Sequence, residues 1–308
     1  MVNSEAGYVV GIDGGGTSIR VAVTTPDLET VGYSEGGSAN PVGVGREAAS
    51  ELIQDKIREA LRRADLNSDD IQAVAAGIAG ASSEYATDWL QTTLRAALPD
   101  ALIVPSSDIE IALVGAHGKR QGVLVLAGTG SVALGINATG EMVRVGGWGY
   151  LLGDEGSGYI IGMQGLRAVA RADDLRIPPT SLTDALLSTV GVTSVMELLT
   201  WLYDRSENRI PQVAALAPIV VEHAPQDATA RAIVNEAIED LADHAETIIR
   251  RLGMVQPEIA FTGGLLTRPN ALSEGLARRL GLTALPVPRY SPVIGAALLA
   301  LEHLRQTR

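Results

Sequence analysis

The 308-residue sequence lacks cysteine altogether and contains only two lysines, Lys56 and Lys119. The absence of cysteine excludes disulfide bonds, thiol nucleophiles, and zinc or iron–sulfur sites that use cysteine ligands. Positive charge is scarce as well, because 24 lysines and arginines face 36 acidic residues and leave a net charge of -12. Such a chain offers no basic surface to a nucleic acid and is repelled by anionic lipid, so we expect neither as a partner.

The chain also lacks a long hydrophobic run. The apolar stretch at residues 292–301 is far shorter than the ~20 residues that span a bilayer. The N-terminal stretch has no basic segment, and its apolar residues are interrupted by Asp13 and three glycines, unlike a signal peptide. We therefore expect a cytoplasmic protein, with a length that suits two domains or one large domain.

Glycine, in contrast, is abundant and concentrates at turns between strands. Residues 8–12 form a short apolar run, and Ile19, Val21 and Val23 alternate with other residues after the sequence DGGGT. A period of two on both sides predicts a β-hairpin with the glycines at its turn. In a dinucleotide-binding domain or a P-loop the glycines open a helix instead, so this pattern excludes both.

The same arrangement recurs in the second half of the chain. Residues 122–127 are apolar, GTGS at residues 128–131 is the turn, and residues 132–136 continue as a strand. This internal repeat predicts a duplicated α/β domain. Helices are predicted at residues 45–64, 87–98, 109–115, 158–173, 183–187, 195–203, 213–224, 229–252, 269–280 and 290–304, and further strands at 71–78, 101–104 and 257–261. The polar residues 117–120 mark the expected boundary between domains 1–116 and 117–308.

The glycine turns are candidate phosphate sites. Converging backbone N–H groups form an anion-binding nest, and glycine lets a phosphate approach without a Cβ in the way. Asp13 enters the first turn and is placed to hold Mg²⁺ through water, because this ion takes one or two carboxylates besides phosphate oxygens. One such hairpin alone is also an ordinary tight turn. A third turn after a strand, Thr262-Gly263-Gly264, favours the ligand-binding interpretation.

Five segments in order resemble a known protein superfamily. GIDGGGT, AGTGS, FTGG and SPVIGAALLAL resemble the phosphate-1, phosphate-2, adenosine and connecting segments shared by sugar kinases, heat-shock ATPases and actin. GGWGYLLGDEGSG, at residues 146–158, is similar to the N-acetylglucosamine kinases of the BadF/BadG-type ATPase family. The resemblance implies an α/β fold of duplicated actin-like ATPase domains of the ribonuclease H-like type, with an inter-domain cleft. It also implies ATP and Mg²⁺ as cofactors, a small-molecule amino sugar as substrate, and a homodimer.

The resemblance assigns roles to individual residues. Asp108 matches the general base that deprotonates the sugar hydroxyl. The positions that match sugar-binding residues are Asn40, Gly147, Trp148, Gly149 and Asp154. Those that match ATP-binding residues are Gly14, Gly15, Gly16 and Thr17, then Gly128, Thr129, Gly130 and Ser131, and finally Ala224, Gly263 and Gly264. Where the family carries Gly-Asp before its long second-domain helix, this chain has Gln226-Asp227.

The implied reaction is transfer of the ATP γ-phosphate to the 6-hydroxyl of N-acetylglucosamine. Glucosamine kinase, N-acetylmuramate/N-acetylglucosamine kinase and a non-kinase ATPase or regulatory module are the alternatives. Without cysteine, the chain cannot hold the iron–sulfur cluster of the family's dehydratase activators or the zinc of ROK-type sugar kinases. Without the motifs, Asp108 would be interpreted as a helix N-cap, Trp148 as core packing and Asp154 as a helix cap.

Overall fold

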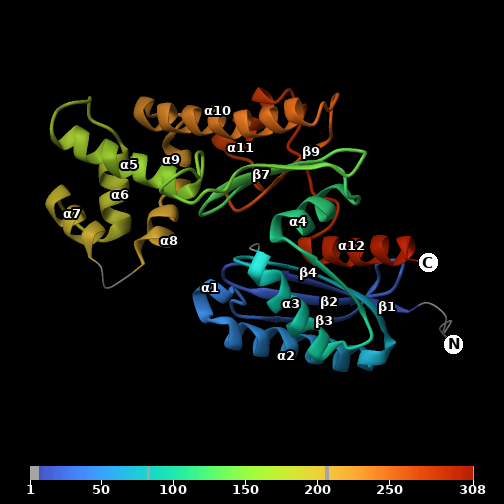
Figure 1. Ribbon diagram of the computed structural model, residues 1–308. Helices are drawn as coiled ribbons and strands as arrows, with labels where there is room; N and C mark the ends of the chain where they lie inside the picture. Colours follow the sequence, from blue (N-terminus) through green and yellow to red (C-terminus); the bar gives the residue numbers. More distant parts are fainter. Residues whose placement is uncertain (1–6, 82–83, 205–207, 308) are drawn as a thin grey trace. The chain divides into compact units, whose positions relative to one another are not determined.

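The computed structural model describes residues 7–81, 84–204 and 208–307 (Figure 1). The chain divides into unit 1, which is Met1–Gly122 with Pro288–Arg308, and unit 2, which is Val123–Val287. The expected division after residue 116 differs from this one mainly at the C-terminal end, because the last helix belongs to unit 1.

Unit 1 is built on a mixed five-stranded sheet. Its strands are β1 (Tyr8–Gly14), β2 (Ile19–Thr24), β3 (Thr30–Gly36), β4 (Ile71–Ile78) and β5 (Leu102–Ser106), in the order β3-β2-β1-β4-β5. β1, β2 and β3 are antiparallel neighbours, whereas β1, β4 and β5 run parallel. The predicted hairpin is confirmed, with DGGGT between β1 and β2.

Helices cover both faces of this sheet. They are α1 (Pro41–Val44), α2 (Arg46–Ala64), the 3₁₀ turn η1 (Ser68–Asp70), α3 (Glu84–Ala97), α4 (Asp108–His117) and α12 (Pro292–Gln306). Because side chains alternate along a strand, Val10 and Ile12 pack with α2 and α3, while Val9 packs on the other face with Ala297 of α12. Figure 1 shows α2 and α12 on opposite faces of the sheet.

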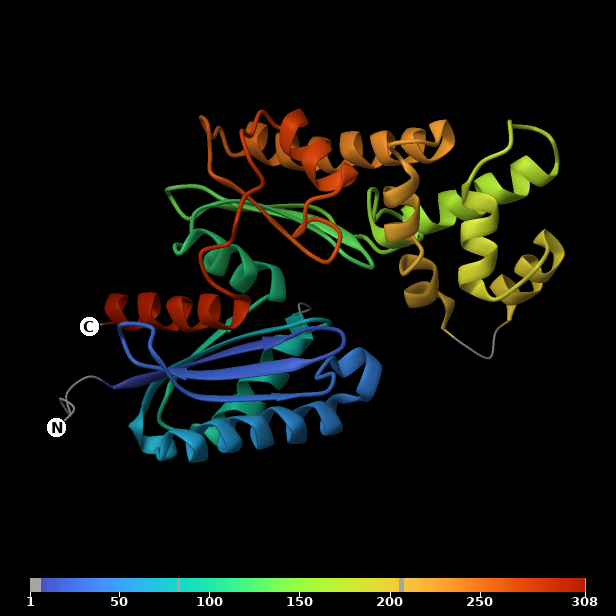
Figure 2. The ribbon, with the colours of Figure 1, turned by 180° about the vertical axis from the view of Figure 1, so that it is seen from behind.

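The return of α12 to unit 1 depends on close backbone contacts. A Cβ added to Gly11 of β1 would lie 2.1 Å from the carbonyl oxygen of Val293, and one added to Gly295 would lie 2.0 Å from that of Ile111. Glycine therefore lets α12 approach both β1 and α4. Figure 2 shows this helix, in red, along the blue strands of unit 1. The periodicity of residues 290–304 predicts the helix, but it does not identify its packing partner.

Unit 2 repeats the same sheet pattern. Its strands are β6 (Gly122–Ala127), β7 (Ser131–Ile136), β8 (Met142–Gly146) and β9 (Ile259–Thr262), in the order β8-β7-β6-β9. β9 is parallel to β6, as β4 is parallel to β1. The expected duplication is confirmed, although within the described residues this sheet has no counterpart of β5.

The helices of unit 2 enclose a separate core. They are α5 (Gly158–Asp173), α6 (Leu182–Val190), α7 (Val195–Tyr203), α8 (Arg209–Ala214), α9 (Ala217–His223), α10 (Ala228–Arg251) and α11 (Ala271–Arg279). The single helix expected over residues 213–224 is wrong, because α8 ends at Ala214 and α9 begins at Ala217. Pro218 lies in the first turn of α9, where a proline is compatible with a helix start. No single described helix is long and apolar enough to cross a membrane; α6 and α7 meet the length and composition test only as a pair bent by 48°.

Candidate functional site

The carboxyl ends of three parallel strands lie level in unit 1. Asp13 of β1 is in register with Arg20 of β2 and Gly77 of β4, and Gly77 is in register with Ser106 of β5. α4 begins at Asp108, two residues after Ser106. The sheet therefore places the two predicted carboxylates, Asp13 and Asp108, along one edge.

Asp13 is a buried carboxylate that contacts the guanidinium of Arg20. It is 8% exposed, and Arg20 Nη1 lies 3.3 Å from its Oδ2. Burial raises the pKa of Asp13, Arg20 partly opposes this rise, and the charge of Asp108 adds to it. Asp13 and Asp108 are thus close enough to interact electrostatically. No group of three or more His, Asp or Glu among the described residues forms a metal cage, so an ion here would take Asp13, water and substrate oxygens.

Asp108 is the first residue of α4, not its cap. The Oγ atom of Ser107 accepts the N–H of Glu110 at 3.2 Å and fills the capping role. The interpretation of Asp108 as an N-cap is therefore wrong. Its half-buried side chain accepts the N–H of Ile109, the next residue of the helix, at 3.0 Å. A Cβ on Gly77 would lie 2.6 Å from the carbonyl oxygen of Ser107, so glycine in β4 lets α4 start against the sheet.

The phosphate-1 turn contains two kinds of glycine. A Cβ on Gly14 would lie 2.5 Å from Ile78, so packing explains this residue. Around Gly16 nothing lies within 4 Å, and the nearest atom to a Cβ on Gly15 is 3.7 Å away. Neither of these two has a positive φ. Within this chain neither crowding nor backbone conformation requires glycine there, which fits a backbone surface that a phosphate approaches. Thr17 is exposed beside them.

Asn40 lies in unit 1, beside the loop that follows β4. Its Oδ1 accepts the N–H of Val42 at 2.9 Å and caps the short helix α1. A Cβ on Gly80 would lie 2.4 Å from the same oxygen, and the N–H of Ala79 donates to the carbonyl of Gly14 at 2.7 Å. The loop that follows β4 is thus bonded to the phosphate-1 turn and also packs against Asn40. The Nδ2 of Asn40 donates to no described residue and is available to a ligand.

In unit 2 the phosphate-2 turn is held by the start of α5. The N–H of Gly158 donates to the carbonyl of Gly128 at 2.8 Å, and that of Tyr159 donates to Thr129 at 3.1 Å. Gly128 has no atom within 4 Å of an added Cβ, and Thr129 is exposed. Ser131 differs from them, because it is 2% exposed and its hydroxyl donates to the carbonyl of Glu155 at 2.6 Å. Its side chain stabilises the turn.

Asp154 joins this turn to the Gly-Trp-Gly segment. Its backbone is left-handed, with φ of 60°, and its side chain is buried. Burial raises the pKa of Asp154, while N–H groups of Ser131 and Gly149 donate to the carboxylate and partly lower it. A Cβ on Gly130 would lie 2.8 Å from Asp154 Oδ2. The cap of α5 is Ser157, so the helix-cap interpretation of Asp154 is wrong.

Trp148 does not pack in a core. It is 69% exposed between Gly147 and Gly149, whose φ angles of 70° and 82° shape the turn. The guanidinium of Arg144 lies 5.4 Å from the ring centroid of Trp148. Leu151 and Leu152 are also exposed. This turn therefore presents an indole ring and apolar side chains to a ligand or partner.

The adenosine segment packs on the end of β6. A Cβ on Gly263 would lie 2.2 Å from the carbonyl oxygen of Ala127, which also accepts the N–H of Leu265 at 3.2 Å. Gly264 is exposed with no atom within 4 Å of an added Cβ. Ala224, in contrast, is 3% exposed and packs in the core of unit 2. Of these residues, Gly264 presents the open surface.

The sequence patterns do not predict the contacts of three polar residues, Arg20, Glu110 and Asp227. Arg20 alternates with apolar neighbours on a strand, and only its pairing with β1 reveals that it faces Asp13. Glu110 contacts Ser106 and Arg120 through tertiary structure. Asp227 caps α10; burial opposes its ionisation, but hydrogen bonds from Ala230, Thr180 and Ser181 outweigh it and lower the pKa to about 2.

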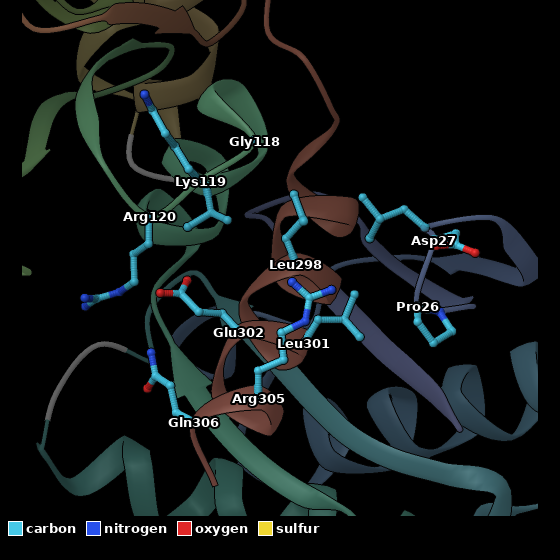
Figure 3. A pocket seen from close by; sticks show the side chains of 12 residues that line it. Pro26, Asp27, Gly118, Lys119, Arg120, Leu298, Leu301, Glu302, Arg305 and Gln306 are labelled. Carbon is cyan, nitrogen blue, oxygen red and sulfur yellow. The ribbon is translucent and has the colours of Figure 1, made fainter. Parts of the chain in front are cut away.

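A pocket of about 570 Å³ in unit 1 contains none of the predicted site residues (Figure 3). It is lined by residues 26–28, by the C-terminal parts of α4 and α12, and by residues 118–120. Asp108 stands at the opposite end of α4, a helix about 15 Å long by its ten residues.

Comparisons with known proteins match nearly the whole chain. A model of the BadF/BadG/BcrA/BcrD ATPase family matches residues 10–300. The chain is 31% identical over 317 residues to the N-acetyl-D-glucosamine kinase of Dictyostelium discoideum, covering 95% of this chain and 97% of the relative. It is 30% identical over 278 residues to the N-acetylmuramic acid/N-acetylglucosamine kinase of Clostridium acetobutylicum, covering 89% and 90%.

A solved structure from Chromobacterium violaceum agrees with these matches. That protein, provisionally assigned as an N-acetylglucosamine kinase, is 28% identical to this chain, and the alignment covers 97% of this chain and 100% of that one. The TM-score is 0.74, so the two share a fold.

Proposed function

The chain belongs to the BadF/BadG/BcrA/BcrD ATPase family, and on this premise we propose that it is an ATP-dependent amino-sugar kinase. Its reaction is transfer of the γ-phosphoryl group of ATP to the 6-hydroxyl of N-acetylglucosamine. The observation that carries the proposal is the position of Asp108 at the start of α4, on the same edge of the sheet as Asp13, in a chain 31% identical to an N-acetyl-D-glucosamine kinase over 317 residues.

Unit 1 supplies the acid–base chemistry in this proposal. Asp108 accepts the proton of the sugar hydroxyl while the hydroxyl oxygen attacks the γ-phosphorus of ATP and ADP leaves. A base positioned in this way suits phosphoryl transfer, which requires little covalent chemistry from the protein. Asp13 would hold Mg²⁺, which when bound would neutralise phosphate charge. Arg20 keeps the Asp13 carboxylate oriented through its contact at 3.3 Å. Asn40 offers its Nδ2 to a sugar oxygen.

The turns of both units supply the phosphate contacts. Gly15 and Gly16 in unit 1, and Gly128 and Gly264 in unit 2, leave backbone surface open around them. Their N–H groups, with Thr17 and Thr129, bind phosphate and ribose oxygens of ATP.

The exposed turn of unit 2 supplies the sugar contacts. Trp148 presents an aromatic face, which suits the apolar side of a pyranose ring or an acetyl methyl group. Asp154 already accepts two N–H groups, so in this proposal its remaining lone pairs accept a sugar hydroxyl.

A coupled assay of ADP formation tests the proposal. With Mg-ATP we expect turnover that depends on N-acetylglucosamine, measured against glucosamine, N-acetylmannosamine, N-acetylmuramic acid and glucose, and a 6-phosphate product by phosphorus NMR. Equal ADP formation with and without every sugar would contradict the kinase assignment and favour a module that only uses ATP. Highest kcat/KM on glucosamine would contradict only the preference for the acetyl group.

The variant Asp108→Asn tests the proposed base. We expect kcat to fall about 10³-fold, with the sugar KM within a few-fold of wild type, because the amide cannot accept the proton. Asp88→Asn, on the exposed surface of α3, is the matched control and should retain full activity. Near-normal turnover of Asp108→Asn would remove this residue from the reaction.

A further inference from the structure

Glu110 is a buried acid that holds the two residues preceding Asp108. It is 8% exposed, and its Oε2 accepts the hydroxyl of Ser106 at 2.7 Å. Its own N–H donates to the Oγ of Ser107 at 3.2 Å. The other carboxylate oxygen, Oε1, accepts the Nε–H of Arg120 at 2.8 Å. One residue therefore fastens the whole junction between β5 and α4.

This arrangement departs from an ordinary helix cap. In a capping box, a glutamate three residues after a serine N-cap reaches back to the backbone N–H of that serine. Ser107 and Glu110 have this spacing, yet the carboxylate of Glu110 bonds to Ser106, the last residue of β5, and to Arg120. The carboxylate is thus used to tie α4 to the strand rather than to complete its cap.

Stability alone does not account for the ion pair. The side chains of Glu110 and Arg120 are only 11% and 26% exposed, and removing both charges from water costs free energy that an apolar pair would not incur. The other residues of α4 up to Ala116, apart from the half-buried Asp108, are apolar and buried. Compared with an apolar contact, the ion pair adds hydrogen bonds of defined direction. These bonds fix the orientation of the junction between β5 and α4.

We propose that Glu110 and Arg120 are positioning residues for Asp108. This inference rests on the proposed function, in which Asp108 is the general base. Gly77 sets how near the junction lies to the sheet, and the Ser106–Glu110–Arg120 hydrogen bonds set the direction in which Asp108 faces. Because Arg120 follows α4 and donates to Glu110, this hydrogen bond connects the segment after α4 to the first turn of that helix. Arg120 also lines the pocket of Figure 3.

Kinetics of Glu110→Gln and Arg120→Gln test the proposal. We expect kcat to fall about tenfold in each, equivalent to about 1.4 kcal/mol, with the KM for ATP within twofold of wild type. Because both substitutions break the same contact, the double variant should be no slower than the slower single variant. Arg120→Lys, which keeps the charge, should recover part of the loss.

The control is a charge pair of similar kind away from the junction. Glu59 on α2 accepts hydrogen bonds from Lys56 and Arg63, and Glu59→Gln should leave kcat unchanged. An equal loss of kcat in this variant would overturn the proposal, as would wild-type kcat in Glu110→Gln. A double variant whose loss is the product of the two single losses would do the same.

Amide hydrogen exchange provides a readout that does not depend on activity. In Glu110→Gln we expect the amides of residues 106–109 to exchange about tenfold faster, while those of β1 and of unit 2 keep their rates. Unchanged exchange at residues 106–109 would overturn the positioning role, whether or not the protein turns over a sugar. Absence of sugar-dependent turnover in the wild type would instead reject only the proposed function. If Glu110→Gln fails to fold, Ser106→Ala removes the 2.7 Å bond alone and takes the same measurements.

Discussion

At the scale of single residues, the glycines of the site regions separate into two groups. Gly77 and Gly263 face backbone atoms at 2.6 and 2.2 Å from an added Cβ, so the fold itself needs them. Gly16 and Gly264 face nothing within 4 Å and have no positive φ. The first group fixes the positions of α4 and of the adenosine segment, and the second leaves backbone open to ATP in the proposed reaction.

Gly16→Ala should therefore separate binding from stability. We expect the free energy of unfolding to change by less than about 0.5 kcal/mol, because the added methyl group meets no atom of the chain. The KM for ATP should rise about tenfold, because the methyl group occupies the path of a phosphate. Urea unfolding and a coupled assay measure the two quantities.

Gly37→Ala is the control, since Gly37 is equally open and also lacks a positive φ. It should change neither stability nor the KM for ATP. An unchanged KM in Gly16→Ala would mean that the phosphate-1 turn does not face the nucleotide at this residue.

At the scale of elements, the long helix α10 depends on a charged cap. Asp227 accepts the N–H groups of Thr229 and Ala230, and also bonds Thr180 and Ser181. These bonds, acting against burial, lower the pKa of Asp227 from 3.8 to about 2. A carboxyl group with a lowered folded-state pKa stabilises the fold above its unfolded pKa and loses this contribution as the pH falls through the folded value.

Asp227→Asn should accordingly destabilise unit 2 by about 2 kcal/mol at pH 7. The difference from wild type should shrink as the pH falls from about 4 towards 2, because the wild-type carboxylate then becomes protonated. Urea unfolding at a series of pH values measures it. Asp243→Asn, on the exposed face of the same helix, is the control and should leave the free energy of unfolding at pH 7 unchanged. A pH-independent difference would mean that the charge of Asp227 is not what stabilises the cap.

Most elements could be predicted from the sequence because their signals are local. Glycine turns between alternating apolar residues identified both hairpins, and apolar periodicity identified β4, α5 and α7 at their observed bounds. β3 and β8 were not predicted, because each is partly exposed and carries polar residues among its apolar ones.

The site could be predicted only where a motif carries it. Asp13, Asp108 and the open glycines follow from the turns and the resemblance. The cap at Ser107, the inward hydroxyl of Ser131 and the burial of Ala224 depend on tertiary contacts that the sequence does not display. The roles of the sugar and ATP residues remain predictions, and so does the homodimer, which sedimentation equilibrium would measure.

At the scale of the whole molecule, unit 1 is assembled from two distant parts of the chain. Residues 288–308 complete it, and Gly295 of α12 meets the carbonyl oxygen of Ile111 with no room for a side chain. The connecting segment recognised as SPVIGAALLAL is thus part of the core of unit 1.

Gly295→Ala should destabilise unit 1 by about 1–3 kcal/mol, because an added methyl group would force α12 and α4 apart. Hydrogen exchange should be faster in β1 and α4, whereas β6 and β9 of unit 2 should keep their rates. Gly43→Ala, at an open position of α1, is the control and should leave both units unchanged. Equal acceleration in both units would mean that the two do not unfold separately.

Because unit 1 is made from two separate parts of the sequence, its assembly depends on the order in which the chain is translated. Residues 123–287 form one continuous stretch of the sequence, so every strand and helix of unit 2 is translated before α12. Until then the face of β1 and β4 that carries Val9, Ala73 and Ala75 has no cover from α12 and is exposed to aggregation. The unit translated first is therefore completed last, and a chain without residues 288–307 would contain every strand and helix of unit 2 but would lack α12 to cover this face of unit 1.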